Sequence, residues 1–131
     1  MTKSIVVADQ RRYKRYKTRQ DSFVAFNSGS LQLGRIINIG KGGLAFFYVE
    51  TQKPINASSK MDIFWANDGF CLAKIPFKIV SDIYLNGKIS DHSIKLRQCG
   101  VEFEQLTHFQ GSTIDYFIGN YTSRQILIST G

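Results

Sequence analysis

Two apolar runs joined by a glycine-rich turn decide the fold, and together they occupy residues 31–49, LQLGRIINIGKGGLAFFYV. The first run, residues 31–39, partly alternates apolar with small or polar residues, as a half-buried β-strand does. Gly40-Lys41-Gly42-Gly43 interrupts it, and residues 44–49 are again apolar. A glycine-rich break between two such runs predicts two strands connected by a tight turn.

Short apolar runs separated by turn residues continue in both directions from this stretch. Strands are predicted at residues 23–26, 61–65, 70–84 and 94–103. The turn Asn67-Asp68-Gly69 between the second and third of these is typical of a hairpin. Pro76 lies inside the run 70–84 and indicates an edge, a bulge or a bend, because proline donates no hydrogen bond to a β-ladder.

One helix is predicted near the C-terminus, over residues 107–121. Thr107 and Gln110 have the spacing of a capping box, in which each side chain bonds to the other residue's backbone N–H. Four apolar side chains then recur at helical spacing and form one face that packs on the core: Ile114, Phe117, Ile118 and Tyr121. The residues after 121 fit either a frayed tail or a short final strand.

About six short strands followed by one helix predict a small, mainly β domain, either a barrel or a sandwich with a C-terminal helix. A chain of 131 residues holds one such domain. No apolar run reaches the length of a membrane span, and residues 1–8 do not resemble a signal peptide, so the cytoplasm is the expected compartment. Cys71 and Cys99 lie in apolar runs and are expected to be reduced core residues, not metal ligands. His92 and His108 are expected at the surface.

The positive charge of the chain is concentrated at its N-terminus. Residues 1–19 hold seven basic residues and one acid, and they therefore carry six of the seven net positive charges. Such a segment suits an anionic partner. The sequence contains no serine-hydrolase elbow, phosphate-binding P-loop or His-Glu-x-x-His motif, so we expect a binding protein and no enzyme.

Two short motifs hold the side chains best suited to binding. Arg11-x-x-x-Arg15 provides two planar guanidinium groups, which bond in pairs to a phosphate or to the O6/N7 edge of guanine. The same spacing occurs again at Arg15-x-x-x-Arg19. In Asn38-Ile39-Gly40-Lys41-Gly42-Gly43, the asparagine amide offers a donor and an acceptor to a base edge, and the glycines allow close approach of a flat ligand. On their own, the first motif also fits a solvated basic tail and the second an ordinary hairpin.

Taken together, the two motifs resemble the PilZ domain family, in which Arg-x-x-x-Arg precedes Asp/Asn-x-Ser-x-x-Gly. Residues 43–46 and 99–106 are similar to that family's third and closing strands. The resemblance runs from about residue 10 to residue 122. It implies a six-stranded antiparallel β-barrel that binds cyclic di-GMP, the bacterial second messenger.

The resemblance also implies a division of the chain and a role for each motif residue. A leader at residues 1–9 would precede the domain at 10–122, whose residues 10–20 form a basic segment that caps the ligand, and residues 123–131 would be a tail. Arg11 and Arg15 would grip phosphates and guanine edges. Arg12 would add charge, although the family motif assigns it no role. Asn38 would bond to a guanine, and Gly43 would give the backbone clearance.

Gly40 departs from the family pattern, which has a serine at this position. Loss of one neutral hydrogen bond costs roughly 0.5–1.5 kcal/mol, so we expect a weakened site. On this basis Gly40→Ser is expected to leave binding unchanged or to strengthen it.

Three functions remain open at this point. The first is a cyclic di-GMP receptor in which the ligand orders the basic segment and alters contact with a downstream protein partner. The second is a PilZ adaptor that contacts proteins and ignores the nucleotide, and the third, less favoured, is a non-specific nucleic-acid binder. The sequence does not predict the oligomeric state.

Overall fold

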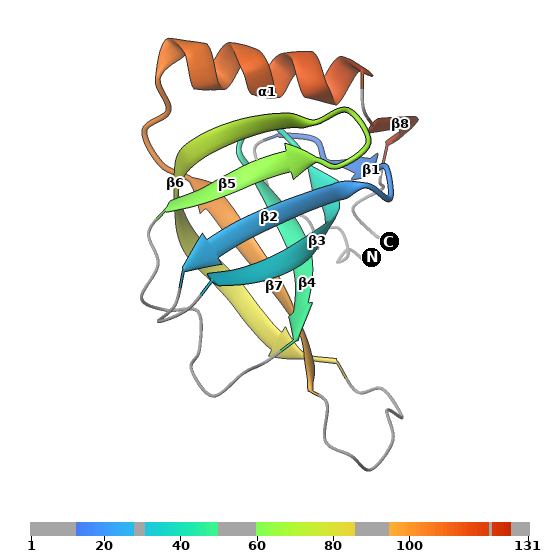
Figure 1. The fold of residues 1–131 in the computed structure, drawn as a ribbon, viewed down its shortest axis with the longest axis vertical. Coiled ribbons are helices and arrows are strands. Elements are labelled where there is room, and N and C mark those ends of the chain that lie inside the picture. Colours follow the sequence, from blue (N-terminus) through green and yellow to red (C-terminus); the bar gives the residue numbers. More distant parts are fainter. Residues whose placement is uncertain (1–12, 28–30, 50–59, 86–94, 121, 127–131) are drawn as a thin grey trace, which may run out of the picture.

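The computed structural model describes residues 13–27, 31–49, 60–85, 95–120 and 122–126 of the 131-residue chain. These residues form eight strands and one helix (Figure 1). In chain order the elements are β1 Tyr16–Thr18, β2 Ser22–Asn27, β3 Leu31–Ile39, β4 Gly43–Val49, β5 Lys60–Trp65, β6 Phe70–Tyr84, β7 Leu96–Phe103, α1 His108–Asn120 and β8 Thr122–Ile126.

Six of the strands close into an antiparallel barrel, in the order β2-β5-β6-β7-β4-β3, with β3 pairing back to β2. The two short strands β1 and β8 continue the sheet beyond β3 and lie outside this closure. The predicted mainly β, six-stranded antiparallel barrel with a C-terminal helix is therefore confirmed. Of the two possibilities left open for the C-terminal residues, the structure shows a short strand at Thr122–Ile126.

The apolar residues of alternate strand positions fill the barrel. In β2, for example, Val24 and Phe26 are buried, while Phe23 before them and Ala25 between them are partly exposed. This is the pattern of a strand with one face on the core and one on solvent. The buried cluster draws on every strand of the barrel and on α1, so a single core supports the whole domain.

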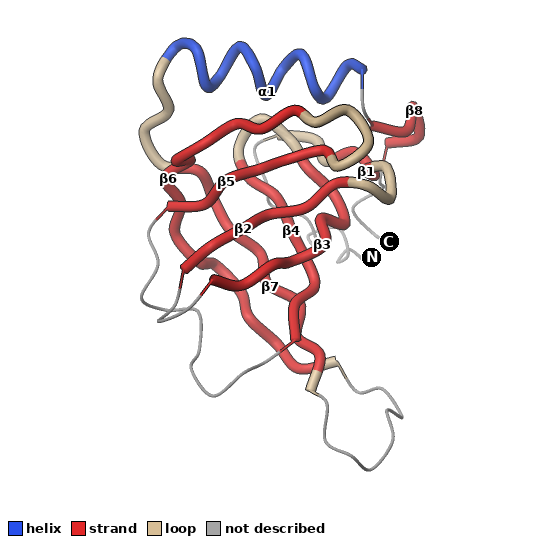
Figure 2. The backbone as a smooth tube through the Cα atoms, viewed as in Figure 1, coloured by secondary structure: helices blue, strands red, loops and turns tan. Residues whose placement is uncertain are grey.

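Helix α1 lies across one end of the barrel (Figure 2). Its Phe117 ring stacks on Trp65 of β5, with ring centroids 3.6 Å apart and planes inclined by 3°. Ile114 is equally buried, and Ile118 is partly buried against the same core. These contacts confirm three residues of the predicted apolar face; the fourth, Tyr121, lies outside the described residues.

The predicted capping box begins this helix. Thr107 Oγ1 accepts a hydrogen bond from Gln110 N–H at 3.0 Å, and Gln110 Oε1 accepts one from Thr107 N–H at 3.0 Å. Two N–H groups that the first helical turn leaves unpaired are thereby satisfied. His108, the first helical residue, is exposed as expected, whereas His92 lies outside the described residues.

Pro76 marks the point at which β6 changes partner. Residues up to Pro76 pair with β5, and residues from Phe77 onward pair with β7. A bulge accompanies the change, because the register with β5 shifts between Met61 and Ile63 and Lys74 has a φ of 59°. The structure thus shows a bulge and not an edge strand, and the missing N–H of proline falls where the ladder passes from one neighbour to the next.

The two cysteines differ, and the prediction for one of them was wrong. Cys99 on β7 is fully buried, and burial raises the pKa of its thiol to about 12. Cys71 was also expected in the core, but it is exposed on β6. The reason is strand alternation: its neighbour Leu72 faces the core, which places Cys71 on the outside. Both thiols are free.

The stacked pair of Phe117 and Trp65 gives a first prediction. Phe117→Ala is expected to lower the free energy of unfolding by about 3–5 kcal/mol, because it leaves a cavity between helix and barrel. Phe109→Ala is the matched control on the same helix, since Phe109 is 68% exposed whereas Phe117 is 1% exposed. It is expected to change stability by less than about 0.5 kcal/mol. Urea unfolding measures both, and equal losses would contradict this account of the helix.

Candidate functional site

The described part of the basic N-terminal segment is built into the sheet. Tyr16 and Lys17 of β1 pair with Ile39 and Asn38 of β3, and Thr18 Oγ1 donates a hydrogen bond to the Ile36 carbonyl at 2.8 Å. The sequence did not predict this strand, because three residues within a run of charges show no alternation. Its effect is to fix the residues that precede it against the β3–β4 turn.

Arg15 and Asn38, one residue from each motif, are in direct contact. Arg15 Nη1 donates a hydrogen bond to Asn38 Oδ1 at 2.7 Å, and the two residues are only 7% and 9% exposed. Hydrogen bonds from a charged donor are stronger than neutral ones, and burial strengthens them further. The two motifs therefore meet in the folded chain although 23 residues separate them.

The alternative match at Arg19 serves a different purpose. Arg19 forms an ion pair with Asp21 at 3.2 Å and lies 3.7 Å from Asp68 in the β5–β6 turn. Two carboxylates thus compensate its charge. The structure therefore distinguishes the two arginines: Arg15 belongs with Asn38, and Arg19 ties the β1–β2 turn to a neighbouring turn.

Gly40 and Gly43 border the same contact and are crowded by backbone. A Cβ atom on Gly40 would collide with the Lys14 carbonyl oxygen and would lie 3.2 Å from Arg15 Cδ. A Cβ on Gly43 would collide with the Val101 carbonyl oxygen and would lie 3.1 Å from Arg15 Nη2. Both positions therefore require glycine for close approach in this arrangement.

This crowding bears on the prediction for Gly40→Ser. The sequence analysis expected the serine to leave binding unchanged or to strengthen it, from the hydrogen bond that a hydroxyl could add. The N-terminal segment instead occupies the space that a Cβ would need. Gly40→Ser would have to move Lys14 and, with it, Arg15.

Four of the six predicted site residues are thus brought together: Arg15, Asn38, Gly40 and Gly43. Arg11 and Arg12 lie outside the described residues. The four that are described come from three places, namely the segment before β1, the end of β3 and the turn into β4.

The strand register places a surface poor in side chains beside these residues. Asn38, Ala45, Gly100 and Ser81 lie side by side across β3, β4, β7 and β6. Their neighbours Ile39, Leu44 and Val101 point into the core, so this row lies on the outer face of the barrel.

A second row on the same face contains Gly43, Glu102 and Lys78. Lys78 and Glu102 form an exposed ion pair at 3.5 Å, at the border of the surface next to Gly43. Sequence reasoning missed Glu102, Lys78 and Gly100 as neighbours of the motifs, because only the register of β4, β7 and β6 brings them together.

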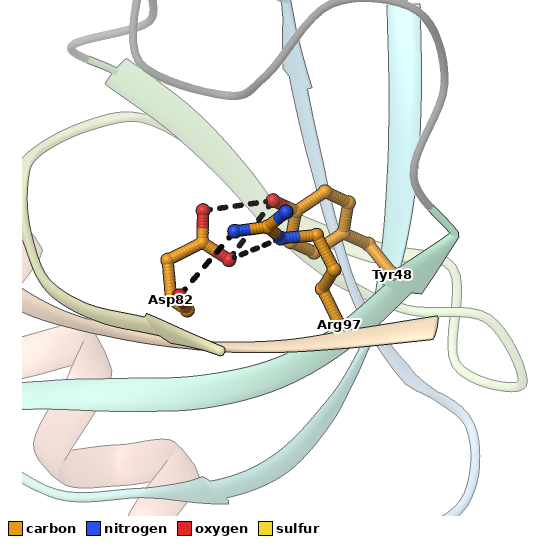
Figure 3. A network of polar contacts seen from close by, with 3 residues as sticks. All are labelled: Tyr48, Asp82 and Arg97. Carbon is orange, nitrogen blue, oxygen red and sulfur yellow. Dashed lines mark hydrogen bonds and ion pairs between the residues drawn. The ribbon is translucent and has the colours of Figure 1, made fainter. Parts of the chain in front are cut away.

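A polar network of Tyr48, Asp82 and Arg97 lies elsewhere, toward the other ends of β4, β6 and β7 (Figure 3). Tyr48 O–H donates to the Asp82 carboxylate at 3.0 Å, and Arg97 Nε donates to the same carboxylate at 2.9 Å. The pKa of Tyr48 is raised, first by burial and then by its hydrogen bond to Asp82. Tyr48 is five residues along β4 from Gly43, or roughly 16 Å at the rise of a strand.

Within this network, the Arg97 guanidinium and the Asp82 carboxylate compensate each other's charge. The Arg97 guanidinium also lies 4.1 Å from the centre of the Tyr84 ring. A carboxylate that already accepts bonds from a phenol and a guanidinium is suited to holding three strands together. We therefore assign it to the stability of the barrel and not to the binding site.

Two further features are absent from the part of the chain that the structure describes. No three histidine, cysteine or acidic side chains gather closely enough there to hold a metal ion. No helix in the described ranges is long and apolar enough to span a bilayer.

Comparison with solved structures finds the same fold. The PilZ domain with c-di-GMP of YcgR from Escherichia coli superimposes with a TM-score of 0.66 at 14% identity, covering 86% of this chain and 92% of that one. The MrkH–c-di-GMP complex from K. pneumonia gives a TM-score of 0.66 at 17% identity over 86% of this chain. MrkH in its apo state gives 0.63 at 19% identity. This chain covers only about half of MrkH, 52% of the complexed chain.

Sequence comparison gives the family directly. No curated protein matches the chain. The family model described as PilZ domain, however, matches residues 9–119, a range that contains both motifs, the whole barrel and nearly all of α1. The fold, the paired motifs and this match agree, and the chain belongs to the PilZ domain family.

Proposed function

We propose that this chain is a receptor for cyclic di-GMP and that Arg15 and Asn38 are central to its binding site. The observation that carries the proposal is the buried hydrogen bond between these two side chains, which joins the two motifs beside an outer surface poor in side chains. Two structural neighbours, the YcgR PilZ domain and MrkH, are described in complex with c-di-GMP. The compartment that we propose is the cytoplasm, and we propose no catalytic step.

The chemistry of the two side chains fits a guanine dinucleotide. A guanidinium bonds in pairs to a phosphate or to guanine O6 and N7, and its flat face stacks on a purine. A carboxamide offers both a donor and an acceptor to the edge of the base. Gly43, Ala45 and Gly100 carry little or no side chain, so a flat base can approach the backbone there once Arg15 moves aside from Gly43.

Binding at these groups requires a rearrangement of the segment before β1. Arg15 and Asn38 are almost fully buried and bonded to each other, so a nucleotide must replace that bond. The pairing of β1 with β3 holds the chain from Tyr16 onward. The change is therefore proposed for the residues that precede Tyr16, with Arg11 and Arg12 adding contacts to the phosphates. The altered segment would then present a different surface to a downstream protein partner.

One observation favours a second function, a PilZ adaptor that contacts proteins without nucleotide. Gly40 stands where the family motif has serine, and Lys14 uses the space that a side chain would need. A segment that packs this closely on the barrel forms a complete protein surface without a ligand. Non-specific binding to nucleic acid is disfavoured, since the exposed aromatic residues among the described ones lie on separate elements: Tyr13 before β1, Tyr84 on β6, and Phe109 and Tyr116 on α1.

The direct test is calorimetric titration of the full chain with cyclic di-GMP. Binding is expected, with salt weakening it because part of the attraction is between basic side chains and phosphates. GMP is the control ligand, and it is expected to bind much more weakly since it has one guanine and one phosphate. Absence of heat up to about 100 micromolar ligand would rule out the receptor and favour the adaptor.

Substitution of the two arginines separates the two possible motif matches. Arg15→Ala is expected to abolish binding, because Arg15 contacts Asn38 and borders Gly43. Arg19→Ala removes the same charge four residues later, from a side chain paired with Asp21 and Asp68. It is expected to change the Kd by less than about threefold. Thermal unfolding of both variants checks that they fold, and equal loss of binding would show that charge alone matters.

Gly40→Ser tests the fit between the N-terminal segment and the β3–β4 turn. We expect a loss of about 1–3 kcal/mol in stability, as is usual when a packed position receives extra atoms, together with weaker binding since Arg15 is displaced. The control is Gly111→Ser on α1, where a Cβ would meet nothing within 4 Å. Chemical unfolding and titration measure the two effects. Tighter binding by Gly40→Ser would contradict this account, because it would show that the hydroxyl adds a contact to the ligand and that the segment moves aside without loss of binding.

A further inference from the structure

A cleft of about 590 Å³ opens beside the candidate site, between the N-terminal segment, the β3–β4 turn and helix α1. Its volume is in the range of sites that take small molecules. Its lining residues come from these three elements: Tyr13, Lys14, Tyr16, Lys41, Asp115, Ile118 and Gly119. None of these residues is among the six that the sequence predicts for the binding site, although Lys41 lies inside the second motif.

The side chains of the cleft suit an anion that carries an aromatic ring. Lys14 and Lys41 provide two ammonium groups against the single carboxylate of Asp115. Tyr13 and Tyr16 provide two rings on which a base can stack. A nucleotide phosphate together with its base has both matching properties, whereas a purely apolar ligand would leave the lysines without a role.

The residues that line the cleft are neighbours in the chain of those proposed above for the site. Lys14 and Tyr16 flank Arg15 in the chain, and Lys41 lies between Gly40 and Gly42. The Tyr13 ring covers Gly42, where an added Cβ would lie 2.8 Å from its Cδ2 atom. In each motif, the residues that line the cleft therefore lie within one or two positions of a residue proposed to belong to the dinucleotide site.

Lys41 combines a fixed backbone with an exposed side chain. Gly40 N–H donates to the Gly43 carbonyl at 2.9 Å, and Phe103 N–H donates to the Gly42 carbonyl at 2.8 Å, so the turn is tied on both sides of Lys41. Its Nζ lies 4.0 Å from Asp115 Oδ1, and the two side chains are 61% and 53% exposed. Because so exposed and so long an ion pair contributes little to stability, Lys41 exchanges this carboxylate for another anion at small cost.

We propose that Lys41 is a ligand-contacting residue that leaves Asp115 to bind a phosphate of the nucleotide, and that Asp115 of α1 limits the affinity by competing for it. This inference rests on the proposed function, since it assigns the cleft to the same ligand. It adds helix α1 to the determinants of binding. Each phosphodiester of the ligand carries one negative charge, as the Asp115 carboxylate does, so the exchange is favoured when a phosphate oxygen comes closer to Lys41 Nζ than the 4.0 Å that separates it from Asp115.

The test is a double-mutant cycle measured by titration of the full chain with cyclic di-GMP. Lys41→Ala is expected to weaken binding about five- to tenfold and to make it less sensitive to salt, because one phosphate contact is lost. Asp115→Asn is expected to tighten binding about two- to fivefold, because the competing charge is gone. In Lys41→Ala/Asp115→Asn, the gain from Asp115→Asn is expected to vanish.

Lys95→Ala is the matched control for charge. Lys95 is also exposed, and it directly precedes β7 at the end opposite Glu102, the residue that pairs with Gly43. The separation of seven positions from Lys95 to Glu102 corresponds to roughly 23 Å along a strand. Binding by this variant is expected to stay within about twofold of the unmodified chain.

The outcomes separate this inference from the function on which it rests. If the unmodified chain fails to bind cyclic di-GMP, the receptor function itself is wrong. If it binds and Lys41→Ala binds equally well, the receptor stands and the role of Lys41 is overturned. If Asp115→Asn tightens binding by the same factor with and without Lys41, the competition is overturned.

Discussion

The pairing of β3 along both of its edges is the constraint on which the site depends. β4 takes one edge, while the other is shared, by β2 at its first residues and by β1 at Asn38 and Ile39. The pairing of β3 with β2 closes the barrel. The pairing of β3 with β1 brings the N-terminal segment back to the sheet and places Arg15 against Asn38. A single strand therefore links closure of the fold to assembly of the two motifs, and the β3–β4 turn that follows it is crowded for the same reason.

Most of the fold was predictable because its signals are local. The runs at 31–39, 70–84 and 107–121 agree with β3, β6 and α1 to within a residue or so, since alternation, turn glycines and a capping box are all written in neighbouring residues. β1 was not predictable, because its stability comes from β3 and not from its own three residues. Cys71 was misplaced for a related reason: in the apolar run 70–75, the sequence does not indicate which alternate residues face inward.

The candidate site was predictable by residue but not by contact. Arg15, Asn38, Gly40 and Gly43 lie together in the structure, and their role in binding stays a prediction. What the sequence did not contain is the distance of Gly40 from the Lys14 carbonyl, or the alignment of Glu102 and Lys78 with Gly43. Both are products of strand register, in which a shift of one residue would send each side chain to the other face. The chemical groups of a site can thus be inferred from the sequence, whereas the space available around them can be inferred only from the structure.

The stacking of Phe117 on Trp65 also has an optical consequence. Trp65 is the only tryptophan in the chain, so any change in tryptophan emission reports one ring in one place. That ring lies in the contact between barrel and helix, with Phe117 on its face and Phe70 nearby. The fluorescence of Trp65 therefore reports whether α1 is packed against the barrel. No added dye is needed, and the tyrosines do not interfere when excitation is set above their absorption.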